Sequence, residues 1–156
     1  MRTSVRPVVA AVLALFAAQS AWSAPAAAPA KGKSLYERLG GETALKAVVD
    51  DFVAAAAPDP KVDFTRGGMW KATDASVAHL KKMLVDFMGQ AFGGPQAYAG
   101  RGMREAHRGM GITQAQFDAL AGHLKATLVK HKVPAKEIDE VMAIAASTAP
   151  DIVEKK

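Results

Sequence analysis

One short stretch of the sequence carries the side chain best suited to bind a metal. Residues 103–112 read Met-Arg-Glu-Ala-His-Arg-Gly-Met-Gly-Ile, which places His107 on a brief helical turn that ends at Gly109 and Gly111. The glycines permit a tight exit from that turn. A histidine held in this way among apolar residues is a suitable metal ligand. The alternative is a structural or surface histidine, which is the commoner role of a single histidine in such surroundings.

Four main helices are expected to position this turn. Apolar residues recur at helical spacing in residues 42–57, 73–92, 113–132 and 135–149. A short helical turn at residues 34–39, with Ser34 as its cap, precedes them. Thr113 and Gln116 form a capping box. No segment alternates as a strand does, so the sequence predicts an all-α fold.

The apolar faces of these helices can form the walls of a cofactor site. In the 73–92 helix the stripe is Val77, Leu80, Leu84, Phe87 and Met88. In the 113–132 helix it is Phe117, Leu120, Ala121, Leu124 and Leu128. On a helical wheel Met83 lies at the edge of the first stripe, and His79 lies further toward the polar side of the helix. Lys81 and Lys82 face away from the stripe. Gly93-Gly94-Pro95 ends that helix, so the His107 turn can face it across a planar apolar cofactor.

The composition of the chain limits the kinds of metal and cofactor sites that it can form. The chain has 156 residues, which suggests one domain, and half of them are hydrophobic. The sequence contains no cysteine. Disulfides, cysteine-ligated zinc, iron–sulfur clusters and haem attached through thioethers are therefore excluded for these residues.

The first residues have the pattern of an export signal. Arg2 and Arg6 precede an unbroken apolar run from Val8 to Ala18, and small residues follow. We expect a signal peptide at residues 1–26 and a flexible spacer at 27–33, with secretion to a bacterial periplasm and no membrane attachment after cleavage. Without Arg2 and Arg6 the chain keeps 18 basic and 15 acidic residues, a net charge of +3. This mild, scattered charge disfavours binding to nucleic acid.

Several motifs resemble those of the group 1 truncated haemoglobins. The matching stretches are Leu35-Tyr36-Glu37-Arg38-Leu39-Gly40-Gly41, Phe92-Gly93-Gly94-Pro95, Tyr98-Ala99-Gly100-Arg101-Gly102-Met103, His107-Arg108-Gly109-Met110-Gly111-Ile112-Thr113 and Phe117-Asp118-Ala119-Leu120. The resemblance covers residues 34–153, the expected haem domain. It implies a two-over-two helical sandwich around non-covalent haem b, with His107 as the proximal iron ligand. The side chains expected against the haem are Phe52, Phe64, Leu80, Leu84, Phe87, Tyr98, Met103, His107, Ile112 and Phe117.

The side of the site opposite His107 departs from this family pattern. Members that bind oxygen tightly usually carry a tyrosine where this chain has Val53, and often a glutamine at the positions of Leu80 or Leu84. No hydroxyl or amide is left there to donate to bound oxygen. Such a bond contributes about 1 kcal/mol or more when buried. Tight oxygen storage and efficient nitric oxide dioxygenation are therefore disfavoured.

Met83 occupies the position of a histidine that serves several relatives as a sixth iron ligand. A thioether is also a haem ligand, and it favours ferrous iron and raises the potential. One hypothesis is a haem held by both His107 and Met83, suited to electron transfer or redox sensing. The other is that Met83 fills the pocket as a flexible apolar side chain.

The sequence thus predicts a haem b protein that binds a diatomic gas, either oxygen, nitric oxide or carbon monoxide, or acts in redox chemistry with a periplasmic partner. The alternatives are a weak nitric oxide dioxygenase or peroxidase, and a haem-free helical interaction domain. Arg101, Arg104 and Lys81 either pair with haem propionates or form a solvated basic face. His123 and His131 are expected to be structural or solvated. The sequence does not define an oligomeric state.

Overall fold

Seven helices make up the described part of the chain, residues 32–155 of this computed structural model. They are α1 (Leu35–Arg38), α2 (Gly41–Ala56), α3 (Asp74–Ala91), α4 (Met103–His107), α5 (Gln114–Lys130), α6 (Ala135–Ser147) and α7 (Ala149–Ile152). These residues contain no strand, and one isolated bridge joins Thr113 to Lys155. The all-α prediction is confirmed. The predicted signal peptide at residues 1–26 and most of the spacer at 27–33 lie outside the described residues.

Side-chain caps define where three of the helices begin. Thr113 accepts from the main-chain N–H of Gln116 at 3.2 Å, while the Gln116 side chain accepts from the N–H of Thr113 at 3.0 Å. Ser34 and Thr73 form the same reciprocal arrangement at the starts of α1 and α3. Each box satisfies main-chain donors that a helix start leaves unpaired. The caps predicted at Ser34 and Thr113 are therefore confirmed.

The single helix predicted at residues 135–149 is two helices in the structure. α6 ends at Ser147, and α7 begins at Ala149 after Thr148. Pro150 explains the break, because it has no N–H to donate back into α6 and its ring would clash with the carbonyl four residues earlier. The Thr148 hydroxyl donates to the carbonyl of Ala145 at 2.7 Å and helps to end α6. The break turns the final residues toward α4.

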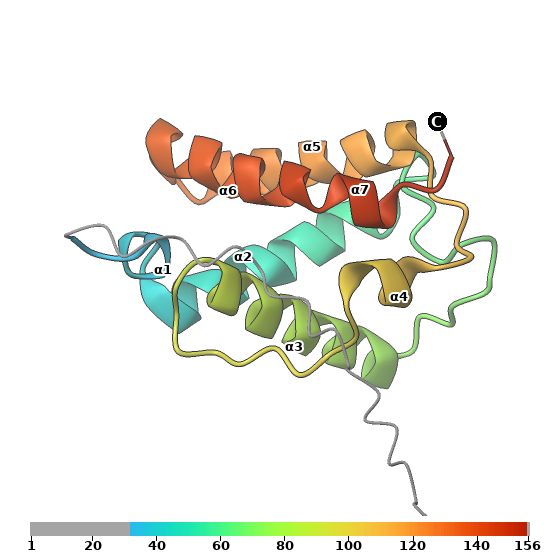
Figure 1. Cartoon of the computed structure of the whole chain (residues 1–156), viewed down its shortest axis with the longest axis horizontal. Helices are drawn as coiled ribbons and strands as arrows, with labels where there is room; N and C mark the ends of the chain where they lie inside the picture. The colour runs from blue at the N-terminus through green and yellow to red at the C-terminus, as the bar shows by residue number, and fades with distance from the viewer. Residues whose placement is uncertain (1–31, 156) are drawn as a thin grey trace, which may run out of the picture.

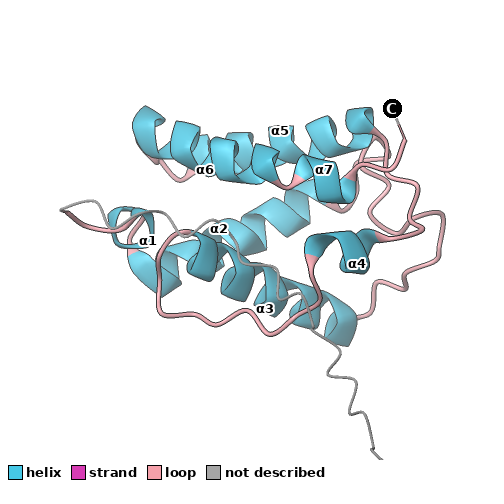
Figure 2. Ribbon diagram, in the orientation of Figure 1, coloured by secondary structure: helices cyan, strands magenta, loops and turns pink. Residues whose placement is uncertain are grey.

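The helices form two layers. α2 packs against α3, α5 packs against α6, and α2 meets α5 between the layers. In Figure 1, α5 and α6 run together above α2 and α3, and α4 is drawn between α3 and α7. Figure 2 shows the long loops that enter and leave α4. This is the two-over-two sandwich that the sequence predicted.

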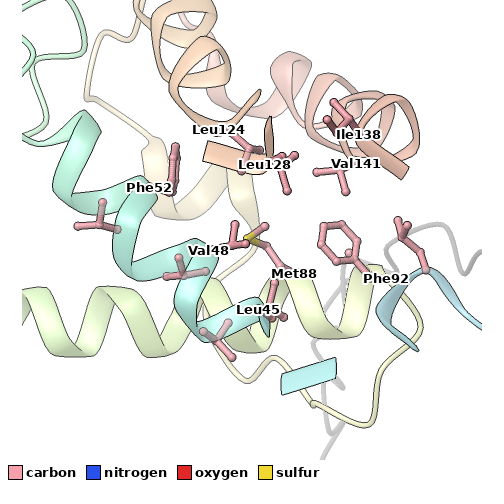
Figure 3. Packing of buried hydrophobic residues seen from close by; sticks show 14 of the residues in the cluster. Leu45, Val48, Phe52, Met88, Phe92, Leu124, Leu128, Ile138 and Val141 are labelled. Carbon is pink, nitrogen blue, oxygen red and sulfur yellow. The ribbon is translucent and has the colours of Figure 1, made fainter. Parts of the chain in front are cut away.

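The buried core lies between the two layers. Figure 3 shows it where α2, α3, α5 and α6 meet: its labelled members are Leu45, Val48, Phe52, Met88, Phe92, Leu124, Leu128, Ile138 and Val141. Leu128, Val49 and Val141 are the largest fully buried side chains. The core holds α2 and α3 against α5 and α6.

None of the helices within residues 32–155 is both long enough and apolar enough to cross a membrane.

Candidate functional site

His107 is oriented by a hydrogen bond within its own helix. The Nδ1–H of His107 donates to the main-chain carbonyl oxygen of Met103 at 2.7 Å, one turn back along α4. This bond fixes the ring and leaves Nε2 as the nitrogen with a free lone pair. Met103 is buried and His107 is half-buried. The arrangement presents Nε2 as a metal ligand.

No group of three or more His, Cys, Asp or Glu side chains in residues 32–155 is arranged to hold a metal ion. A porphyrin would supply four nitrogen ligands to an iron, so that a single histidine such as His107 could complete its attachment to the protein.

Several apolar side chains of α3 and α5 are only partly covered by the protein. The predicted stripe of α3 is buried only at Met88, whereas Leu80, Leu84 and Phe87 are half-buried. The stripe of α5 behaves in the same way, with Leu124 and Leu128 buried and Phe117 half-buried. Leu84 and Phe87 pack against the core, whereas Leu80 and Phe117 are not among the side chains of the core or those packed against it. Leu80 and Phe117 lie in the N-terminal halves of their helices.

The 61–72 loop contributes two aromatic side chains on the side of α2 and α3. The rings of Phe64 and Trp70 lie 6.0 Å apart. Together with Val53 of α2 and Val77 of α3 they line a cavity of about 200 Å³. Phe64 thus shares a cavity with Val53, the position that the sequence placed opposite His107.

Lys81 does not face away from the fold, contrary to the wheel prediction. Its ammonium pairs with Asp50 of α2 at 2.9 Å, and its stem lines the same cavity. Lys82 follows the prediction, with an exposed pair to Asp86. Because α3 packs closely on α2, the face that carries Lys81 meets α2 and not open solvent. Lys81 therefore already has a carboxylate partner within the chain.

The loop before α4 is held by Tyr98. Its ring meets Phe87 edge-on, with centroids 5.5 Å apart, and its hydroxyl donates to the carbonyl of Arg101 at 2.9 Å. Burial raises the pKa of the Tyr98 hydroxyl. The ring lies so close over Gly100 that a Cβ there would come within 2.3 Å of it. Tyr98 thus joins α3 to the approach to α4.

The remaining predicted residues divide between core and loop. Phe52 is part of the buried core, while Ile112 is half-buried just after the glycines. His79 is exposed on α3, as its position on the wheel predicted. His123 donates to Asp59 at 2.7 Å and His131 donates to Asp51 at 2.8 Å, so both are structural.

Two residues that bind the turn after His107 were missed by sequence reasoning. The Glu154 carboxylate accepts from the main-chain N–H groups of Gly109 and Gly111. Arg66 of the 61–72 loop donates to the carbonyl of Met110 at 2.9 Å. Arg104, considered for propionate pairing, is bound to Asp151 at 2.7 Å. These contacts join segments far apart in sequence, and no local pattern marks them.

A two-layer helical sandwich with a half-buried histidine held through Nδ1 and half-buried apolar side chains on its helices is consistent with a haem-binding globin. A family profile of bacterial-like globins matches residues 34–154. Group 1 truncated haemoglobin GlbN of Mycolicibacterium paratuberculosis is 35% identical over 123 residues, covering 79% of this chain and 86% of that protein. GlbN of a Synechocystis strain is 37% identical over 120 residues, covering 74% and 92%.

The solved structures agree with this class. The Fe(III) form of truncated haemoglobin from Tetrahymena pyriformis superposes with a TM-score of 0.70 at 36% identity, covering 79% of this chain and 100% of that one. The chain belongs to the group 1 truncated haemoglobins. Its cofactor is haem b. The residues present fit that cofactor, because His107 is held through Nδ1 with Nε2 left as a ligand, and α3 and α5 carry half-buried apolar side chains.

Proposed function

We propose that this chain binds a diatomic gas reversibly at a haem b iron held by His107. The observation that carries the proposal is the hydrogen bond from His107 Nδ1–H to the Met103 carbonyl, because it leaves Nε2 as the ring nitrogen that can bind the iron. When bound, the haem supplies an iron with one coordination position left for a small ligand. The chain's own residues must then hold the ring, exclude water and decide which ligand is favoured.

The apolar side chains perform the first two tasks. Leu80, Leu84 and Phe87 of α3 are half-buried, so covering them with a flat apolar ring removes their surface from water. On the far side Val53 is only 4% exposed, and no polar side chain replaces the tyrosine that relatives place there. A ligand in this site is surrounded by hydrocarbon.

This apolar environment determines the preference that we expect between oxygen and carbon monoxide. Oxygen gains most from a hydrogen-bond donor beside it, since its bound form carries partial negative charge, whereas carbon monoxide gains little. With Val53, Leu80 and Leu84 beside the ligand, we expect rapid oxygen dissociation and a strong relative preference for carbon monoxide. Sustained oxygen storage is not the role that these residues suit.

Absorption spectra of the purified protein test the proposal. Ferrous protein should take up carbon monoxide stoichiometrically with a Soret shift, and His107→Ala should lose this response or hold hemin poorly. His79→Ala, which removes an exposed histidine on α3, is the matched control and should behave as the parent chain does. A chain that stays colourless after incubation with hemin would instead support a haem-free helical interaction domain.

Met83 supports a second candidate, a redox role with a sixth iron ligand. Its side chain is half-buried and lies outside both the buried core and the apolar residues packed against it, whereas Met88 on the same helix is buried in that core. The Met83 thioether is therefore not committed to core packing. We propose that it is free to reach the iron when no gas is bound.

Ferric absorption and carbon monoxide kinetics test this second candidate. A thioether ligand should give a weak far-red ferric band and slow the binding of carbon monoxide, because the sixth ligand must leave first. Met83→Ala should remove the band and speed binding, while Met142→Ala, a half-buried methionine of α6, should change neither. A spectrum without that band, unaltered by Met83→Ala, would leave Met83 as an apolar filler.

We further propose that the protein acts outside the cytoplasm, in a bacterial periplasm. The support is the basic start, apolar run and small residues at positions 1–26. Mass spectrometry of the protein recovered from a periplasmic extract should show a chain that begins near residue 27. A full-length chain confined to the cytoplasmic fraction would exclude export.

A further inference from the structure

The segment after α7 is bound to the turn that follows His107 by a set of short contacts. Glu154 Oε1 accepts from the N–H of Gly109 at 2.6 Å, and Oε2 accepts from the N–H of Gly111 at 2.5 Å. The N–H groups of Glu154 and Lys155 donate to the carbonyl of Ile112 at 2.9 and 3.1 Å. The two carboxylate oxygens thus bind the two glycines separately.

The backbone of the turn is shaped to receive this carboxylate. Gly109 has φ of +80° and Gly111 has φ of +60°, both in the left-handed region. Neighbouring N–H groups that converge in this way form a concave site for an anion. A Cβ on Gly111 would lie 3.2 Å from the Lys155 side chain, so the final segment also packs closely on the turn.

α4 needs such support from outside. It has only five residues and no side-chain cap at Gly102, and a helix of this length has little stability of its own. α7, just before this segment, also binds α4: Asp151 accepts from Arg104 at 3.0 and 2.7 Å. The N–H groups of Gly109 and Gly111 lower the pKa of the Glu154 carboxyl, so it is ionised at neutral pH.

We infer that Glu154 is a positioning residue for His107. Its carboxylate fixes the exit of α4 two residues beyond His107, and the Met103 carbonyl fixes the ring from within α4. The two restraints together set the direction in which Nε2 points. Glu154 does not touch the ligand, and its effect passes through the glycine turn. The inference deepens the proposed function, because it rests on His107 as the iron ligand.

Hydrogen exchange measured by NMR on the haem-loaded, carbon monoxide-saturated chain tests the contact itself. The amides of Gly109 and Gly111 should be protected in the parent chain and lose protection in Glu154→Ala. Glu154→Gln keeps one acceptor oxygen and turns an N–H against the other glycine, so one of the two amides should lose protection. Glu42→Gln, which alters an exposed carboxylate of α2, should leave both amides unchanged.

The iron–histidine stretching band of the ferrous protein, read by resonance Raman, tests the effect on His107. It should shift or broaden in Glu154→Ala, and hemin transfer to a scavenger globin should become roughly three- to tenfold faster. Glu42→Gln should change neither. An unchanged band in Glu154→Ala, even with lower thermal stability, would make Glu154 a merely structural residue and overturn the inference.

The two proposals fail in different ways. If the parent chain takes up no hemin, the proposed function is wrong, and exchange at Gly109 and Gly111 in that haem-free chain still shows whether Glu154 holds them. If hemin binds normally and Glu154→Ala leaves both amides protected, the positioning inference alone is wrong.

Discussion

Leu84 is one of the side chains expected against the haem, and it offers no hydrogen-bond donor to a bound gas. It is half-buried on α3 and packs against the core. Glutamine has similar length and a good helix propensity, so it can replace leucine there without disturbing α3. Under the proposed function, the change adds one amide N–H beside the ligand.

We expect Leu84→Gln to slow oxygen dissociation by about tenfold, the factor that corresponds to one buried hydrogen bond. Stopped-flow displacement of oxygen by carbon monoxide measures the rate. Leu39→Gln makes the same chemical change at another half-buried site, outside the predicted haem contacts, and should leave the rate unaltered. An equal rate in Leu84→Gln and the parent chain would place the ligand away from this part of α3.

The order of helices and the His107 turn could be predicted from sequence because their signals are local. Caps at Ser34 and Thr113 and the glycines after His107 act within a few residues, and the structure has each of them. Glu154 could not be found in this way. Its partners lie 45 and 43 residues away, and an acidic residue near the end of a chain has no pattern of its own.

α2 and α5 are joined by two carboxylate–histidine pairs. Asp51 accepts from His131 and from Lys130, while Asp59, just beyond α2, accepts from His123. The order of the pairs is reversed along the two segments, which reflects their antiparallel packing. The sequence showed the histidines but not their partners, because the register between the two helices depends on the assembled fold.

These pairs predict a pH-dependent contribution to stability. Hydrogen bonds with Lys130 and then His131 lower the pKa of Asp51, and the bond with His123 lowers that of Asp59. A carboxyl whose pKa is lower in the folded chain than in the unfolded chain stabilises the fold. This stabilisation is fully present above the unfolded pKa of about 4. It is lost as the pH falls through the lower pKa of the folded chain.

Asp51→Asn and Asp59→Asn should each lower the urea midpoint modestly at pH 7. The difference from the parent chain should shrink as the pH falls below about 4, where the parent carboxyl also becomes protonated. Asp139→Asn, at an exposed site of α6, serves as the control and should leave the urea midpoint unchanged at pH 7 and at pH 3. A deficit that is the same at pH 7 and pH 3 would show that the carboxylate charge does not contribute.

Arg66 connects the 61–72 loop to the loop after His107. Its guanidinium donates to the Met110 carbonyl at 2.9 Å and to Gln116 at 3.3 Å, and its side chain is 12% exposed. We expect Arg66→Ala to lower the free energy of unfolding by about 2 kcal/mol, because the Met110 carbonyl loses a charged donor. Chemical denaturation measures this change.

Arg66→Lys keeps the charge but not the planar fork, so it should recover only part of the loss. Lys71→Ala, at an exposed position of the same loop, should cost little. If Arg66→Ala and Lys71→Ala have the same midpoint, the guanidinium contacts contribute nothing measurable to holding the loop.

The whole molecule has an incomplete apolar interior. α3 and α5 each bury one part of their stripe and leave the other half-covered. The periodicity predicted the helices and their apolar faces, but not which residues of each face would pack in the core, since a sequence pattern does not distinguish burial by protein from burial by a cofactor. Haem should therefore contribute strongly to the stability of the fold.

Removing haem should lower the thermal midpoint by about 10 °C or more, because a ligand bound only by the folded state stabilises it by mass action. Calorimetry of the haem-free and reconstituted chains measures the shift. His107→Ala should show a smaller gain on adding hemin. Equal midpoints with and without hemin would mean that the half-buried stripes do not contact the ring.

The contact between Glu154 and the glycine turn also has a consequence for the order of events during folding. A contact across more than forty residues forms late, because the intervening chain must be arranged first. Until that contact forms, the His107 ring is held by the hydrogen bond within its own short helix. We therefore expect firm capture of haem late in folding, after Glu154 has reached the glycine turn.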